Sequence, residues 1–215
     1  MTATIHAAAP ETSAAPVVAS ETPAIKPHTS VADVLKGMSE DEFFAWCQQQ
    51  RDQKFERRAD GTIELMPLTG GESGRRNSRL TSRLDRWAED TGLGVVFDSS
   101  TGFRLPNGAV RSPDAAWVST AAWQALTDEQ RRKHPPLCPD FAVGRLSETD
   151  TINDLVLKMQ EYLSNGLRLG WLLDPKTGQA RVFRANGSVE VKTFDETLSG
   201  EDVLPGFTFA LNALR

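Results

Sequence analysis

The sequence is poor in the residues that build disulfide frameworks and metal–imidazole sites. Two of its 215 residues are cysteine and three are histidine. Cys47 and Cys138 lie far apart and lack the spacing of zinc ligands, which predicts two reduced thiols and argues against a zinc site. No apolar run approaches the ~20 residues that span a bilayer, and the N-terminus lacks the basic start and apolar core of a signal peptide. We therefore expect a cytoplasmic protein without a membrane segment.

An excess of positive charge is also absent. The formal net charge is -5, from 24 Lys and Arg against 29 Asp and Glu. This balance argues against a protein that coats nucleic acid over its whole surface. It leaves room for a local basic groove, because binding depends on where the cations lie.

Residues 1–30 lack aromatic side chains and any apolar periodicity. They are rich in Ala, Pro, Thr and Ser, and such a segment cannot bury enough surface to offset the entropy of ordering it. We expect 1–30 to be a disordered tail. Residues 31–215 are long enough for one domain with a proper core.

The rest of the chain alternates between helical and strand patterns. Ser39 and Glu42 have the spacing of a capping box, and Asp60-Gly61 supplies a hairpin turn within 54–67. Helices are expected near 40–50, 73–90, 119–134 and 151–165. Two strands are expected within 94–108, with turns at Ser99-Ser100 and Asn107-Gly108, and further strands near 113–118, 140–146, 168–174, 179–184 and 188–194. Helices interspersed with strands, and hairpins at both ends, predict an α/β fold with a mixed sheet.

A stripe of arginines runs along one side of the second expected helix. Its members are Arg75, Arg79, Arg83 and Arg86, with Arg76 at its edge. The stripe is compatible with a solvated helix face. It is also compatible with contacts to the phosphates of nucleic acid, because five arginines on one side exceed what solubility requires.

The helix expected at 151–165 carries Lys158 at the border of its apolar face. Tyr162 lies one turn further along the same border, whereas Gln160 lies elsewhere on the helix. A lysine in such a place commonly extends its stem along the surface toward water. Alternatively, its stem crosses the apolar edge and reaches a neighbouring strand.

Three carboxylates stand in or at the start of expected strands. Asp114 and Asp140 each follow a proline there, and Glu56 lies in the first hairpin. Taken singly, each aspartate is compatible with a turn or cap, and Glu56 with an edge-strand charge that deters aggregation. Taken together with Lys158, they suggest metal-dependent phosphodiester chemistry. Mg²⁺ requires hard oxygen ligands, and a nearby cation stabilises developing phosphorane charge.

Several longer segments make the combination more specific. They are "MPLTGGESGRRNSRL", "GVVFDSSTGFRLPNGAVRSPDAAWVS", "PPLCPDFAV", "KMQEYLSNGLRLGWLLDPKTG" and "LSGEDVLPGF". Over roughly residues 38–211 the chain resembles the Uma-type restriction-endonuclease family, within the PD-(D/E)xK nuclease superfamily. The resemblance implies a restriction-endonuclease-like fold, in which a mixed central sheet is flanked by helices and the metal site lies where two strands diverge.

The resemblance also implies roles for individual residues. Asp114 matches the family's proline-aspartate metal ligand, which implies Mg²⁺ as the cofactor. Lys158 matches a catalytic lysine that lies on the following helix, and Gln160 and Tyr162 match polar positions on that helix. Glu56 matches the acidic residue after an aromatic in the first hairpin. Asp140 is expected only to start its strand.

One position departs from the family pattern. Where the family has a second acid in a Val-Val-Glu run, this chain has Ala142-Val143-Gly144. Glu148 and Asp150 follow shortly after, but a strand rises ~3.3 Å per residue, so only a turn that folds back would bring either into reach. Gly144 therefore marks a degenerate position that puts catalysis, though not the fold, in question.

Three functions stay open from the sequence. The first is a Mg²⁺-dependent DNA endonuclease with a weakened site. The second is a catalytically inactive nuclease fold that binds DNA or a protein partner. The third is an interaction protein without a nucleic-acid role. A homodimer is compatible with each of them.

Overall fold

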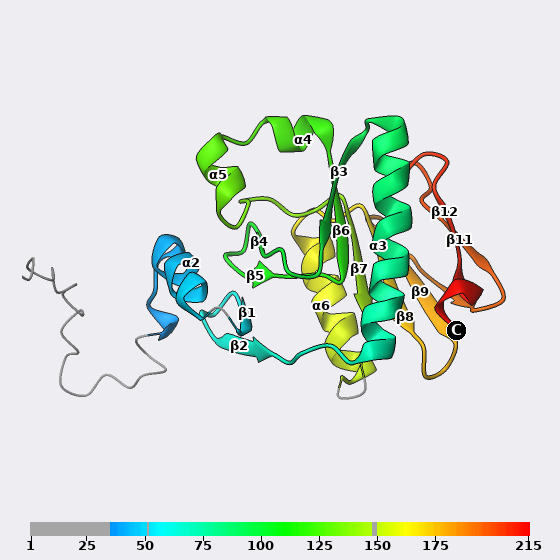
Figure 1. The fold of residues 1–215 in the computed structure, drawn as a ribbon, viewed down its shortest axis with the longest axis horizontal. Helices are drawn as coiled ribbons and strands as arrows, with labels where there is room; N and C mark the ends of the chain where they lie inside the picture. Colours follow the sequence, from blue (N-terminus) through cyan, green and yellow to red (C-terminus); the bar gives the residue numbers. More distant parts are fainter. Residues whose placement is uncertain (1–34, 51, 148–149) are drawn as a thin grey trace, which may run out of the picture.

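The computed structural model describes residues 35–50, 52–147 and 150–215 (Figure 1). The predicted tail at 1–30 lies outside the described residues. The longest helix, α3, stands upright beside a sheet whose other side carries α6 (Figure 1). This is the α/β architecture that the alternating helix and strand patterns predicted.

The central sheet has six strands in the order β10-β9-β8-β7-β6-β3. Their bounds are β3 Gly94–Asp98, β6 Ala115–Ser119, β7 Phe141–Arg145, β8 Leu169–Asp174, β9 Gln179–Arg184 and β10 Val189–Thr193. β7 pairs antiparallel with β6 and parallel with β8, so the sheet is mixed. The prediction that residues 113–118 and 140–146 form adjacent strands is confirmed.

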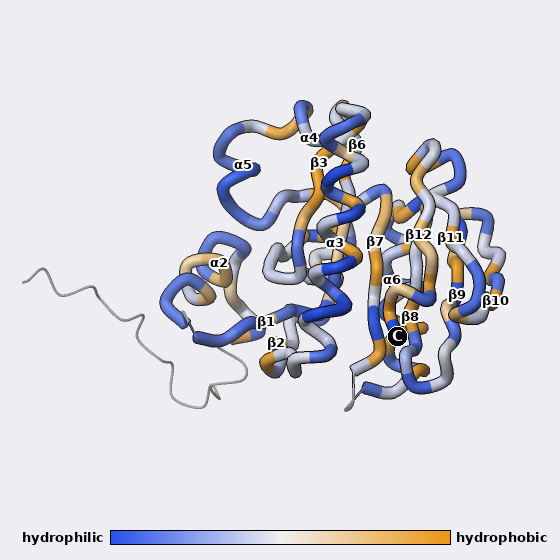
Figure 2. The backbone as a smooth tube through the Cα atoms, turned by 45° about the vertical axis from the view of Figure 1, so that its right-hand side comes forward, coloured by the Kyte–Doolittle hydropathy of each residue, from blue (hydrophilic) through white to orange (hydrophobic). Residues whose placement is uncertain are grey.

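Two helices cover opposite faces of this sheet. Successive side chains of a strand point to opposite faces. Val143 of β7 packs in the same cluster as Leu84 of α3 (Gly71–Thr91), and Ala142 packs with Met159 of α6 (Ile152–Ser164). Because both of its faces are covered, β7 is mainly hydrophobic, whereas α5, which has no buried residues, is hydrophilic (Figure 2). Because Gly144 has the same strand parity as Ala142, it lies on the α6 face.

A second sheet combines the N-terminal hairpin with a later segment of the chain. Its order is β2-β1-β5-β4, and its strands are β1 Lys54–Arg57, β2 Ile63–Met66, β4 Phe103–Arg104 and β5 Val110–Arg111. The hairpin turns at Gly61, whose φ of 84° favours glycine. Helix α2 (Glu40–Gln49) precedes it, capped by Ser39 and Glu42 as predicted.

The single helix predicted at 119–134 was wrong. The segment forms two short helices, α4 (Thr120–Gln124) and α5 (Asp128–Arg132). Thr127 accepts a hydrogen bond from Gln130 N, and the Gln130 side chain accepts one from Thr127 N. This second capping box starts a new helix where the apolar pattern alone indicated continuation.

The C-terminal segment forms elements that the sequence patterns did not indicate. They are a two-stranded sheet of β11 (Thr197–Ser199) and β12 (Thr208–Ala210), followed by the short 3-10 helix η1 (Leu211–Leu214). Leu198, Phe209 and Leu211 are buried in the same cluster as the apolar face of α3. The last residues therefore close the core on the side of the sheet opposite α6.

The structure can be compared with the predictions on the two cysteines and on membrane-spanning segments. Cys47 and Cys138 are both free, as predicted. Burial raises the pKa of Cys47 to about 11 and that of Cys138 to about 12, so both thiols are protonated at neutral pH. Across the described part of the chain, none of the helices combines the length and apolar character needed to cross a membrane.

Candidate active site

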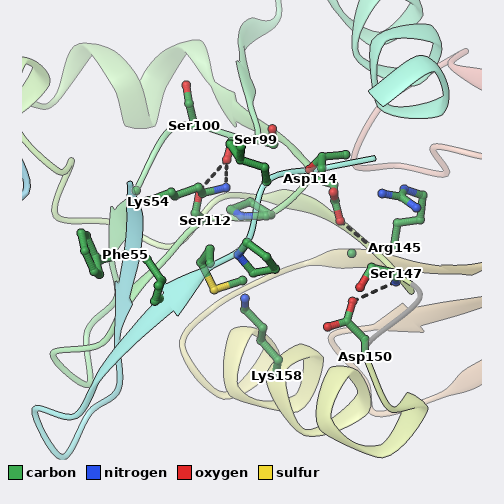
Figure 3. Close-up of a pocket in the computed structure, with 18 of the residues that line it drawn as sticks. Lys54, Phe55, Ser99, Ser100, Ser112, Asp114, Arg145, Ser147, Asp150 and Lys158 are labelled. Atoms are coloured by element: carbon green, nitrogen blue, oxygen red, sulfur yellow. Dashed lines mark hydrogen bonds between the residues drawn. The ribbon is translucent and has the colours of Figure 1, made fainter. Parts of the chain in front are cut away.

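A cavity of about 1260 Å³ lies between the N-terminal hairpin, the start of β6, the end of β7 and α6 (Figure 3). Asp114, Gly144 and Lys158 all line it. The acid, the degenerate position and the lysine that the resemblance singles out therefore surround one space. Glu56 is buried and contacts the Lys158 ammonium group at 2.6 Å.

Two donors fix the Asp114 carboxylate. Its Oδ1 accepts from the Asn77 side chain of α3 at 2.7 Å, and its Oδ2 accepts from the backbone N–H of Arg145 at 2.7 Å. The Asn77 amide is held in turn, because its Oδ1 accepts from Arg145 Nε at 2.9 Å. The Asp114 N–H donates to Val143 O at 2.8 Å. These contacts place the carboxylate directly beside Gly144.

Glu56 lies between the charged groups of Arg111 and Lys158. It is 1% exposed, so the interpretation of this residue as an edge-strand charge was wrong. Its carboxylate accepts from Ser112 N at 2.9 Å, from Arg111 Nη1 at 3.2 Å and from Lys158 Nζ at 2.6 Å. Three donors therefore satisfy the hydrogen-bonding capacity of this buried carboxylate.

Arg111 connects three carboxylates from three elements. Besides Glu56 of β1, its guanidinium binds Glu64 of β2 at 3.0 Å and Glu161 of α6 at 2.6 Å. Burial alone would lower the pKa of Arg111, but the hydrogen bond that Arg111 donates to Glu161 and the charges of Glu56 and Glu161 raise this pKa overall. Arg111 therefore ties the hairpin to α6 and keeps Glu56 in place beside Lys158.

The Lys158 side chain crosses the apolar edge of its helix and reaches a neighbouring strand, which is the second of the two interpretations drawn from the sequence. Its side chain is 19% exposed and crosses from α6 to Glu56 in β1, 102 residues away in sequence. Tyr162 also lines the cavity but is 2% exposed, and within the described structure its hydroxyl has no hydrogen-bond partner. Burial raises the pKa of Tyr162 well above its ordinary value. Gln160 is exposed on α6, outside the cavity lining.

Gly144 leaves space for a side chain. A Cβ at this position would lie 3.6 Å from Leu172 Cδ1 and 3.9 Å from Met159 Cε, which are ordinary van der Waals distances. Gly144 is not among the residues with positive φ, so a side chain would not strain the backbone. The glycine is thus not required by the fold of β7.

The chain turns back toward the cavity after β7. Asp150 lines the cavity, and its Oδ2 accepts from Ser147 N at 2.8 Å. This is the fold-back that the sequence analysis required for a substitute acid. Glu148, the other candidate, lies outside the described residues.

The acids present fit a divalent metal ion only in part. Among the described residues, the carboxylates that line the cavity are Asp52, Asp114 and Asp150. Over residues 35–50, 52–147 and 150–215, no group of three or more His, Cys, Asp or Glu side chains is arranged to hold a metal ion. Mg²⁺ commonly binds through one or two carboxylates and several waters. Asp114 can supply one such ligand, and position 144 supplies none.

The arginine stripe of α3 has partners that the sequence did not reveal. Arg76 Nε donates to Leu214 O at 2.5 Å, and Arg79 Nη1 donates to Ala213 O at 2.6 Å. Arg75 donates to the Arg215 carbonyl at 2.9 Å. The guanidinium of Arg83 stacks over Phe209, 5.2 Å from the ring centroid, and Arg86 lines a separate shallow pocket nearby. None of the five arginines lines the main cavity, and their contact with phosphates stays a prediction.

Asp140 has the structural role that was expected of it. Its Oδ2 accepts from the backbone N–H of Ser119 at 2.8 Å, and Arg168 Nη1 lies 3.7 Å from Oδ1. The carboxylate therefore joins the start of β7 to the end of β6. It does not line the cavity that contains Asp114.

Lys54 is a cavity residue that the sequence analysis missed. Its ammonium group donates to the Ser99 carbonyl beside Ser112 and Asp114 (Figure 3). Burial lowers the pKa of Lys54, and the charges of Glu56 and Asp114 counteract this only in part. One signal was available: Lys54 and Glu56 are two residues apart in a strand and so share a face.

Comparison with known proteins identifies the family and the fold of the chain. Residues 40–212 match the model of the Uma2 family, described as "Putative restriction endonuclease". The fold is similar to a "putative nuclease belonging to DUF820" from Anabaena variabilis ATCC 29413, with a TM-score of 0.66, 17% identity, 82% of this chain and 97% of that chain covered. A DrdV–DNA complex is more distant, with a TM-score of 0.37, 16% identity, and 59% and 10% covered. No curated protein matches the chain. Because the family match spans most of its length, the chain belongs to the Uma2 family and has a restriction-endonuclease-like fold.

Proposed function

We propose that this protein is a nuclease of the Uma2 family that acts on DNA and whose metal site is weakened by Gly144. The observation that carries the proposal is the convergence of Asp114, Gly144 and Lys158 on one cavity. Metal-assisted phosphodiester hydrolysis uses carboxylate ligands and a nearby cation. The cavity is lined by the carboxylate of Asp114 and by Lys158, and it has room for a second acid at position 144.

Each residue has a distinct part in the proposed reaction. Asp114 would hold Mg²⁺, which when bound supplies a Lewis acid for the phosphoryl oxygens and lowers the pKa of a bound water. Lys158 would orient the attacking water or stabilise the charge that develops on the phosphorane. Glu56 acts through Lys158, since its carboxylate holds the ammonium group in place. Tyr162 lines the cavity and retains the supporting role that the family resemblance implies, whereas Gln160 lies outside the lining.

The same geometry supports the proposal of a weakened metal site. With glycine at position 144, Asp114 is the acid contributed by the paired strands, and both of its oxygens already accept a hydrogen bond. Fewer anionic ligands lower the affinity for Mg²⁺ and leave more of its shell to water. We expect little cleavage at physiological Mg²⁺.

The second candidate is a nuclease fold that binds DNA or a protein partner without cleaving. Gly144 favours it directly. The structural partners of Asp114, Glu56 and Lys158 favour it as well, because each of these side chains is accounted for by the fold. The homodimer and the cytoplasmic location stay predictions from the sequence in either case.

Nicking of supercoiled plasmid DNA distinguishes the candidates. We expect wild type to cut little in Mg²⁺ and not at all in chelator, and Gly144→Glu to cut faster. Adding Asp114→Asn to Gly144→Glu should remove the gain. A folded Gly144→Glu protein that never cuts would support the binding-only candidate. Robust cutting by wild type that survives Asp114→Asn would require another set of ligands.

A further inference from the structure

We propose that Lys54 is a second phosphate-contacting cation, and that Lys54 and Lys158 together bind a DNA phosphodiester in the cavity without a metal ion. The inference rests on the proposed function, because it takes nucleic acid as the ligand. It adds a residue from the first hairpin and a mode of binding that does not depend on an acid at position 144.

Lys54 differs from Lys158 in what neutralises it. Lys158 is paired with the Glu56 carboxylate at 2.6 Å. Lys54 donates to the carbonyl of Ser99, and among the described residues it forms an ion pair with no carboxylate. An ammonium group has three donors, so two remain for a ligand. A half-buried cation that is not directly paired with a carboxylate is a favourable partner for an anion.

The two lysines enter the cavity from separate elements. Lys54 reaches in from β1 above the Ser112 segment, and Lys158 reaches in from α6 (Figure 3). The charge of Lys158 lowers the pKa of Lys54 further, which shows that the two ammonium groups influence each other. An anion between them would relieve this repulsion.

The missing acid changes what the cavity can accept. An acid at position 144 would add a negative charge on the α6 face, where Lys158 lies. Asp114 does not offset the two lysines fully, since Asn77 and the Arg145 N–H already bind its oxygens. The cavity therefore favours a phosphate more than a glutamate-containing site would, in the absence of metal.

Fluorescence anisotropy with a short fluorescein-labelled oligothymidine in EDTA tests the proposal. We expect wild type to bind and Lys54→Met to bind roughly tenfold more weakly, since a hydrogen bond to a charged group is lost. The slope of log K against log salt should fall by about 0.7, the value for one phosphate contact of a single strand. Lys54→Arg should keep most of the affinity.

Lys176→Met is the matched control, because Lys176 is exposed in the β8–β9 turn and outside the cavity. It should bind like wild type. Lys54→Met should remain folded, because Ser112 Oγ also donates to the Ser99 carbonyl, at 2.9 Å. Thermal unfolding of each variant checks this.

Two results would overturn the proposal. One is equal binding by Lys54→Met and wild type, and the other is binding by wild type only when Mg²⁺ is added. Either can occur while Gly144→Glu cleaves plasmid DNA in Mg²⁺, in which case the proposed nuclease function stands and the metal-free phosphate site does not. If binding in EDTA depends on Lys54 and Gly144→Glu does not cleave DNA, the metal-free phosphate site stands and the proposed nuclease function does not.

Discussion

The two sides of the cavity differ in how well their charges are matched. On the hairpin side, Glu56 and Arg111 have partners from β1, β2, β5 and α6, and both are almost fully buried. On the sheet side, Asp114 faces Gly144, where a second acid would complete a metal site. The cluster of Glu56 and Arg111 on the hairpin side is therefore matched in charge without any ligand, whereas Lys54 and the sheet side are not.

The difference distinguishes residues that stabilise the fold from residues that would serve catalysis alone. Glu56 and Asp114 each satisfy buried donors, so their presence is explained by stability alone. Gly144 contacts its neighbours at ordinary distances and satisfies no polar group through a side chain. The presence of Glu56 and Asp114 is thus weaker support for catalysis than the sequence suggested. Whether the protein is a nuclease therefore depends on position 144.

Glu56→Gln should have the largest effect on stability. The substitution leaves Lys158 without its buried counter-charge and removes one of the three carboxylates of Arg111. Breaking a buried pair in this way costs about 3–5 kcal/mol. Urea unfolding measures the loss. Glu190→Gln, in an exposed ion pair with Arg184, is the control and should change little. If both variants lost the same small amount, the hairpin side would not be the electrostatic anchor.

Asp114→Ala should have the next largest effect. It leaves the Arg145 N–H and the Asn77 amide without their acceptor, at a cost of about 1–3 kcal/mol. Asp114→Asn keeps one acceptor oxygen and should cost less. The comparison of the two variants by urea unfolding isolates the structural role of the carboxylate. Equal stability of wild type and Asp114→Ala would leave that role unsupported.

His134 gives the stability a pH dependence that neither side of the site explains. Burial lowers the pKa of His134 to about 4, from the usual 6.5. Between these values the unfolded chain takes up a proton that the folded chain does not, so stability falls as pH decreases from 6.5 to 4 and is constant with respect to this group above 6.5. His134→Gln should flatten the melting temperature over this range. An unchanged slope in the variant would show that another group titrates.

Gly144→Glu should have the smallest effect on stability. The new Cβ has room beside Leu172 and Met159, and replacing a glycine within a strand offsets part of the cost of placing a carboxylate there. We expect a change within about 1 kcal/mol in urea unfolding. A loss as large as that of Glu56→Gln would mean that the cavity does not tolerate an acid at this position.

The sequence was sufficient to predict much of the sheet and its polar edge. Apolar runs bounded by turns located β6, β7 and β8, and the Pro-Asp pattern placed Asp114 at the start of its strand. The i, i+3, i+4 pattern identified α6 and put Lys158 at its border. These features are local, because periodicity and turn residues act within one element.

The features that were missed depend on contacts between distant segments. The pairing of β1 with β5 builds the second sheet from residues about fifty positions apart, and no local sequence pattern predicts this pairing. The partners of the α3 arginines lie in the C-terminal η1 segment, more than a hundred residues later. Charge patterns identify a face, but the partner of that face is decided by tertiary packing.

The central proposal is that Gly144 weakens Mg²⁺ binding in the cavity that Asp114 lines. Calorimetric titration of Mg²⁺ into wild type, Gly144→Glu and Gly144→Gln tests it most directly, since glutamine has the shape of glutamate without its charge. We predict weak binding by wild type and by Gly144→Gln, and binding by Gly144→Glu at least about tenfold tighter, a difference of about 1.4 kcal/mol. Equal Mg²⁺ affinities for the Glu and Gln variants would contradict the account.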